Sequence, residues 1–84
     1  MPYELAIADS VRDRLRKMIK KDSVSYKRIL KVFDQLAENP EGVGKWMHSE
    51  YAMVREKHIG HFVLKYTINE KEKVVTIVDY DHHK

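Results

Sequence analysis

Cysteine is absent from the 84-residue sequence, which excludes disulfides and thiolate metal sites and fits a reducing compartment. Long apolar runs are absent too, whereas a membrane-spanning helix needs roughly 18 or more such residues. The N-terminus, Met1-Pro-Tyr-Glu-Leu5, lacks the charged and hydrophobic regions of a signal peptide. We therefore expect a cytoplasmic protein with no membrane segment and no recognisable export signal.

The excess of one sign of charge over the other is also small in this sequence. The net charge of +3 is compatible with a polyanion or with an acidic protein partner, and it is too small to demonstrate either. A chain of this length forms one small domain, here residues 1–84, and buries only about 60% of its unfolded surface. No internal repeat, linker or low-complexity segment divides it.

Two amphipathic helices are predicted in the first half of the chain. Ser10 and Asp13 resemble a capping box at the start of the first helix, and Asp22 and Ser23 can cap the second. The second helix should end near Asn39, because Pro40 disfavours helical geometry in the residue before it. Six apolar residues give this helix the cleanest period in the sequence: Tyr26, Ile29, Leu30, Phe33, Leu36 and Ala37.

Four strands complete the predicted pattern. Residues 3–7, 51–58 and 61–68 alternate between apolar and polar side chains, and residues 74–80 form a run rich in β-branched residues. Short connections join the last three strands, which indicates an antiparallel meander. The order strand, helix, helix, three strands predicts an α+β fold. The helical hairpin should pack on one face of a mostly antiparallel sheet.

Parity along the strands predicts which side chains the helices leave uncovered. In the strand at 61–68 the even-numbered apolar residues suit the core, which leaves Lys65 on the opposite face. If Val54 faces the helices in the preceding strand, Arg55 and Lys57 join Lys65 on the open face. A register slip of one residue would reverse this arrangement.

The last predicted strand leads directly into Asp79-Tyr80-Asp81-His82-His83-Lys84. Imidazoles accept and donate protons near neutral pH, so His82 and His83 are candidates for the acid and base that cleave a phosphodiester. Tyr80 is a candidate for stacking on a base. Cations neutralise a phosphate and its transition state, and the candidates for that role are Arg55, Lys57, Lys65 and Lys45. The competing interpretation is a polar chain end beside solvated charges.

Two further features carry weaker predictions. Asp79, Asp81, His82 and His83 are metal-ligand residue types, but they show no recognised ligand spacing, so we predict neither a metal nor a cofactor. Six basic residues lie between Arg12 and Lys21, and they form either an interaction surface or, as we favour, a solvated helix face.

Nearly the whole chain resembles the RelE/ParE superfamily of toxins from toxin–antitoxin systems. The resemblance rests on the element order and on three segments. The segments are the helix ending Leu36-Ala-Glu-Asn-Pro40, the block Arg55-Glu-Lys-His-Ile-Gly60-His-Phe-Val-Leu-Lys-Tyr66, and Val74-Val-Thr-Ile-Val78 followed by Asp-Tyr-Asp-His-His83.

The resemblance implies a type II toxin that a RelB-like antitoxin neutralises. RelE-like members cut messenger RNA in the ribosomal decoding site, and their second-strand cations hold the phosphate. Arg55 and Lys57 match those cations, and His82 or His83 matches the catalytic residue after the last strand. We therefore expect a ribosome-dependent messenger-RNA endoribonuclease whose catalytic residues are His82, His83, Arg55 and Tyr80.

Two departures from the family pattern leave alternatives open. Val63 stands where the family often has Arg, and the catalytic Tyr that many of these nucleases have further along has no counterpart before Lys84. The alternatives are a ParE-like toxin that inhibits DNA gyrase without catalysis, and a decayed toxin that only binds its antitoxin. The expected partners are the ribosome, messenger RNA and an acidic antitoxin segment that folds on binding, and a homodimer is left open.

Overall fold

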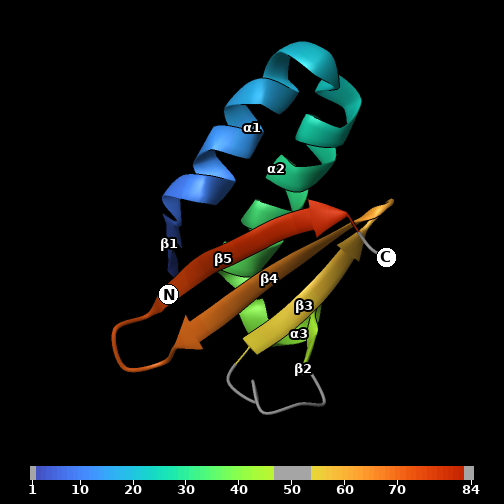
Figure 1. The fold of residues 1–84 in the computed structure, drawn as a ribbon. Coiled ribbons are helices and arrows are strands. Elements are labelled where there is room, and N and C mark those ends of the chain that lie inside the picture. The colour runs from blue at the N-terminus through green and yellow to red at the C-terminus, as the bar shows by residue number, and fades with distance from the viewer. Residues whose placement is uncertain (1, 47–53, 83–84) are drawn as a thin grey trace.

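The computed structural model describes residues 2–46 and 54–82, which form two layers. A pair of helices covers one face of a five-stranded sheet (Figure 1). The elements follow in this order: β1 (Glu4–Ile7), α1 (Asp9–Lys21), α2 (Ser23–Glu38), α3 (Pro40–Val43), β2 (Lys45–Trp46), β3 (Val54–Ile59), β4 (Phe62–Asn69) and β5 (Val74–His82). The predicted α+β fold and its element order are confirmed. The short elements α3 and β2 were not predicted, and residues 51–53 of the second predicted strand lie outside the described residues.

The strands lie in the order β1-β5-β4-β3-β2. β5 pairs parallel to β1 and antiparallel to β4, and the remaining pairs are antiparallel. The helical hairpin begins directly after β1 and packs over one face of the sheet (Figure 1). The strand that closes the described chain therefore lies inside the sheet, between the first strand and the meander.

The two main helices begin in different ways. α2 begins after Asp22, whose carboxylate accepts hydrogen bonds from the Ser25 backbone N–H (3.1 Å) and hydroxyl (2.6 Å). This cap was predicted, and so was the end of the helix before Pro40. The predicted capping box at Ser10 is wrong, because α1 begins at Asp9 after Ala8, and no described side chain caps it.

Both layers contribute to one hydrophobic core. Ile29 and Leu36 of α2 are fully buried against Leu64 of β4 and Val75 and Ile77 of β5. These helix positions recur at the spacing of one helical face, which explains why the hairpin packs as a unit on the sheet. Among the described helices, none is both long and apolar enough to cross a membrane.

An extra residue in β5 changes the direction of its side chains. Lys65 pairs with Asp79 and Tyr66 pairs with Ile77, so Val78 has no partner in β4. This arrangement is a β-bulge, in which two residues of one strand oppose one residue of the other. Alternation therefore restarts after Val78, and Tyr80 lies on the same face as Ile77.

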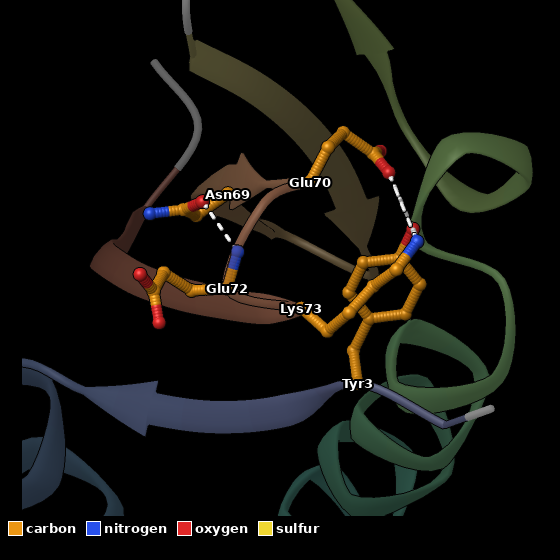
Figure 2. A network of polar contacts seen from close by, with 5 residues as sticks. All are labelled: Tyr3, Asn69, Glu70, Glu72 and Lys73. Atoms are coloured by element: carbon orange, nitrogen blue, oxygen red, sulfur yellow. Dashed lines mark hydrogen bonds and ion pairs between the residues drawn. The ribbon is translucent and has the colours of Figure 1, made fainter.

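A polar network fastens the start of β1 to the turn between β4 and β5 (Figure 2). The Tyr3 hydroxyl donates a hydrogen bond of 2.7 Å to Glu70, and the Lys73 ammonium lies 3.6 Å from the same carboxylate. Within the turn, the Glu72 N–H donates to the Asn69 side chain at 2.9 Å. The hydrogen bond from Tyr3 and the nearby Lys73 charge lower the pKa of Glu70 below its usual value.

This network predicts a loss of stability in acid. Because the folded-state pKa of Glu70 is lowered, its contribution is complete above the ordinary value of 4.5 and is lost as the pH falls through the folded-state value. We expect Glu70→Gln to flatten the fall in unfolding free energy between about pH 6 and about pH 3, measured by urea denaturation. Equal slopes for this variant and wild type would contradict the predicted role of the network, and Glu72→Gln is the matched control.

Candidate functional site

The strand register places two predicted phosphate ligands on the covered face of the sheet. Residues directly opposite each other on paired strands share a face. Arg55 pairs with Tyr66 and Lys57 pairs with Leu64, and both partners are completely buried in the core beneath the helices. The prediction that Arg55 and Lys57 lie on the open face is therefore wrong, because Val54 and not Arg55 is directed away from the helices.

The buried Arg55 side chain connects β3 to the α3 segment. Its guanidinium Nη1 donates hydrogen bonds to the carbonyl oxygens of Glu41 (3.2 Å) and Gly44 (3.3 Å). Beside it, the Tyr66 hydroxyl donates to the Pro40 carbonyl at 2.9 Å. A side chain at Gly44 would collide with the Tyr66 hydroxyl and would lie 2.6 Å from the Glu56 carbonyl oxygen. These contacts hold α3 and the segment after it tightly against β3 and β4.

Lys57 lies on this covered side but remains partly exposed. It lines a hollow of about 420 Å³ between the end of α2 and α3, whose other lining residues are Gln35, Glu38, Asn39, Gly42 and Val43. Lys57 is thus separated by the sheet from the open face on which it was predicted to act.

The open face carries charges of both signs. Lys65 pairs with Glu56 on one side and with Asp79 on the other, so carboxylates flank it on both neighbouring strands. His58 follows on the same face, with its Nε2 3.8 Å from the Glu56 carboxylate. Of the three strand cations predicted to converge there, only Lys65 lies on this face, and two carboxylates flank it. Over the described strands, the open face therefore lacks the concentrated positive charge on which the phosphate-binding prediction depended.

Tyr80 lies in the core, only 1% exposed, because the bulge at Val78 directs it toward the helices. Its ring stacks on Phe62 with centroids 4.8 Å apart. Burial, and secondly the negative charge of Asp22, raises the pKa of Tyr80 to about 12. The prediction that Tyr80 stacks on a base from the open face is wrong, since its ring is covered by protein.

His82 is the candidate catalytic residue that the structure leaves accessible. Its imidazole is exposed and lies on Phe62, with ring centroids 4.3 Å apart and an angle of 31° between the planes. Its backbone N–H donates to the Asp81 carboxylate at 2.7 Å. His83 lies outside the described residues. Lys45 belongs to β2, where it pairs with Glu56.

His82 borders a hollow of about 380 Å³ at the end of the helical hairpin. Eight residues line it: Arg14, Lys17, Met18, Lys21, Asp22, Phe62, Tyr80 and His82. We name this site the α1–β5 hollow. Its cations come from α1, whose basic residues we had favoured as a solvated face. The sequence does indicate that these cations lie together, because Arg14, Lys17 and Lys21 recur at the spacing of one helical face.

Ion pairs at the α1–β5 hollow are exposed. Arg14 Nη1 lies 3.3 Å from the Asp81 carboxylate, and about half of each side chain is exposed to solvent. Such pairs contribute little to stability, about 0–1 kcal/mol. Across the described residues, no group of three or more metal-ligating side chains comes together.

Comparisons with known proteins converge on one family, although no family model matches the chain. The chain is 35% identical to "Putative toxin RelE4" of Methanocaldococcus jannaschii over 81 residues, which cover 96% of this chain and 86% of the relative. Its fold is similar to that in the crystal structure of the RelBE2 toxin–antitoxin complex of Mycobacterium tuberculosis. The TM-score is 0.83 at 25% identity, covering 99% and 100% of the two chains.

A second solved structure supports the same fold. The archaeal RelE–RelB complex of Pyrococcus horikoshii superposes with a TM-score of 0.75 at 22% identity and covers 98% of this chain and 96% of that chain.

The geometry around Arg55 predicts a loss of stability on its removal. Arg55→Ala removes two partly buried hydrogen bonds from a charged donor and the packing of a buried side chain, so we expect the unfolding free energy to fall by about 2–4 kcal/mol. Lys65→Ala on the open face is the control and should change it by less than about 0.5 kcal/mol. Urea denaturation measures both. Equal stability of the two variants would show that the Arg55 contacts do not hold α3.

Proposed function

The chain belongs to the RelE family of toxins, and we propose that it inhibits translation by cutting messenger RNA on the ribosome. The observation that carries this proposal is its 35% identity to a RelE toxin across 96% of the chain. The fold supports it, because the chain superposes on a chain of the RelBE2 toxin–antitoxin complex with a TM-score of 0.83 over 99% of its length.

The proposed chemistry is cleavage of a phosphodiester by the neighbouring ribose 2′-hydroxyl. A base removes the hydroxyl proton, the oxygen attacks phosphorus, and an acid protonates the departing 5′-oxygen. We assign these proton transfers to His82 and His83. His82 suits the role because its ring is exposed at the end of a rigid strand and is oriented by Phe62.

The cations that we predicted to bind the phosphate lie on both faces of the sheet. Lys65 and Lys57 lie on opposite faces of the sheet, so the two cannot hold the same phosphate. Lys65 also lies on the face opposite to His82, so we retain Lys65 and Lys45 only as proposed contacts to the RNA strand away from the scissile phosphate. We leave Arg55 and Tyr80 out of the proposed catalytic set, because both side chains are buried and Arg55 binds backbone carbonyls.

Replacing both terminal histidines tests the assignment. We expect His82→Ala/His83→Ala to slow cleavage of ribosome-bound messenger RNA by a factor of about 100 or more, because acid–base catalysis typically contributes that much. Cleavage is measured by primer extension on a translated message, with Lys71→Ala in the β4–β5 turn as the control.

Two results would contradict the proposal. Cleavage by the double variant at the wild-type rate would remove the role of the histidines. Growth arrest with intact messages, together with inhibited supercoiling by purified gyrase, would instead identify a ParE-like toxin.

We further propose that an acidic antitoxin segment binds the helical hairpin. Two similar solved structures are complexes of this kind, namely the RelBE2 toxin–antitoxin complex and the archaeal RelE–RelB complex. On the hairpin, Ile19, Val24 and Leu30 are large apolar residues that are 41–65% exposed, and the basic residues of α1 surround Ile19. Apolar contact beside cations suits an amphipathic acidic helix.

Salt should weaken this complex. We expect the Kd for the antitoxin to rise about tenfold or more between about 50 mM and about 500 mM NaCl, because salt screens exposed charges. Calorimetry on the purified pair measures it. A Kd that does not change with salt would show that charge attraction does not drive binding.

A further inference from the structure

We propose that the α1–β5 hollow is a binding site for one nucleotide, with the base in the hollow and the phosphate on the lysines of α1. Nothing in the family assignment specifies this hollow. The choice of a nucleotide as ligand rests on the proposed RNA-cleaving function, whereas the hollow itself is a feature of the described structure.

The hollow has the size and lining of a small-molecule site. Its volume of about 380 Å³ lies in the range of ordinary ligand pockets. Met18 and Phe62 supply an apolar floor, the buried Tyr80 ring stacks on Phe62, and His82 stands at the border of the hollow. A flat base presents two apolar faces and a polar edge, which suits a floor of this kind.

The Tyr80 hydroxyl indicates that a polar ligand group belongs there. The residue is 1% exposed, and its hydroxyl has no hydrogen-bond partner among the described residues. Buried polar groups nearly always have a partner, so an unpaired one calls for a specific explanation. The same tyrosine lines the hollow, so a hydrogen-bonding group of a ligand can supply the missing partner.

Charge at the rim suits a phosphate. Arg14, Lys17 and Lys21 lie on one side of α1 and border the hollow, where they face the single carboxylate of Asp22. Arg14 is already paired with Asp81, whereas neither lysine forms an ion pair with a described residue. Lysine ammonium groups bind phosphate as point charges.

The polar groups favour a base over an acidic side chain of a protein partner. The Tyr80 hydroxyl can donate or accept, and the Asp22 carboxylate accepts. The edge of a base offers both donors and acceptors, so it can satisfy both groups. The carboxylate of an acidic peptide could accept from the Tyr80 hydroxyl, but it offers no donor to Asp22 and is repelled by that carboxylate.

The location gives this site a role in the proposed reaction. His82 borders the hollow and is one of the two proposed proton-transfer groups. A nucleotide held there would lie next to the scissile phosphate, so the hollow would select the base beside the cut.

The test begins with nucleoside 5′-monophosphates. AMP, GMP, CMP and UMP are titrated separately into the full-length chain at low salt, and binding is followed by calorimetry and by NMR shifts of Tyr80 and His82. We expect at least one monophosphate to bind, and inorganic phosphate and the matching nucleoside to bind much more weakly.

A short RNA oligonucleotide is titrated in a second experiment. Tighter binding of the oligonucleotide identifies an RNA strand as the natural source, and equal binding identifies a free nucleotide.

Three variants locate the site. Tyr80→Phe should weaken binding about tenfold, the effect of losing one hydrogen bond, while thermal stability stays the same or rises because an unpaired hydroxyl is removed. Lys17→Gln/Lys21→Gln should weaken binding of the monophosphate by about tenfold or more, while Lys71→Gln, in the β4–β5 turn, leaves it unchanged. If Tyr80 had only a structural role, Tyr80→Phe would not lower the affinity for the monophosphate while the protein stays stable.

The outcomes separate this proposal from the proposed function. If no monophosphate binds, or if these variants bind as wild type does, the nucleotide site is wrong, whether or not messenger RNA is cut. If a monophosphate binds as described and no RNA is cut, the site stands and the endonuclease proposal is wrong. If an acidic peptide shifts the NMR signals of Tyr80 and no monophosphate does, the nucleotide site is also wrong.

Discussion

The bulge at Val78 is the constraint on which the arrangement of the C-terminal strand depends. β4 and β5 pair along their length, but one extra residue in β5 shifts the alternation of its side chains. Without this shift, the Tyr80 side chain would point away from the helices, and the core would lose the Tyr80 ring. With it, Tyr80 and Phe62 stack beneath α1, and His82 follows on the same side. The position of one unpaired residue thus determines which chemical groups adjoin the helices.

The covered and open faces of β3 follow from the same kind of alternation. Leu64 and Tyr66 are completely buried, so their partners Lys57 and Arg55 must share the helical side. Arg55 tolerates burial because backbone carbonyls of the α3 segment accept its hydrogen bonds. A residue type expected to bind a substrate phosphate therefore holds two parts of the chain together.

Periodicity predicted the fold well because most elements repeat their apolar residues clearly. The stripe from Tyr26 to Ala37 and the alternation in 61–68 were sufficient to place helices and strands. The faces of β3 could not be predicted, because Val54 and Ile59 are both apolar yet have opposite parity. Neither the bulge nor the carbonyl partners of Arg55 has a local signature, since each depends on contacts between distant segments. The cations of α1 that border the α1–β5 hollow were assigned to a solvated face, because charged stripes on helices are usually solvated.

The position of β5 has a consequence for how the molecule is made. β1 finds its only described strand partner in β5, so a nascent chain that stops before Val74 has no sheet to which β1 can add. The first and last strands must meet across nearly the whole chain, and such distant pairing slows folding. The sheet can therefore close only after β5 has been synthesised.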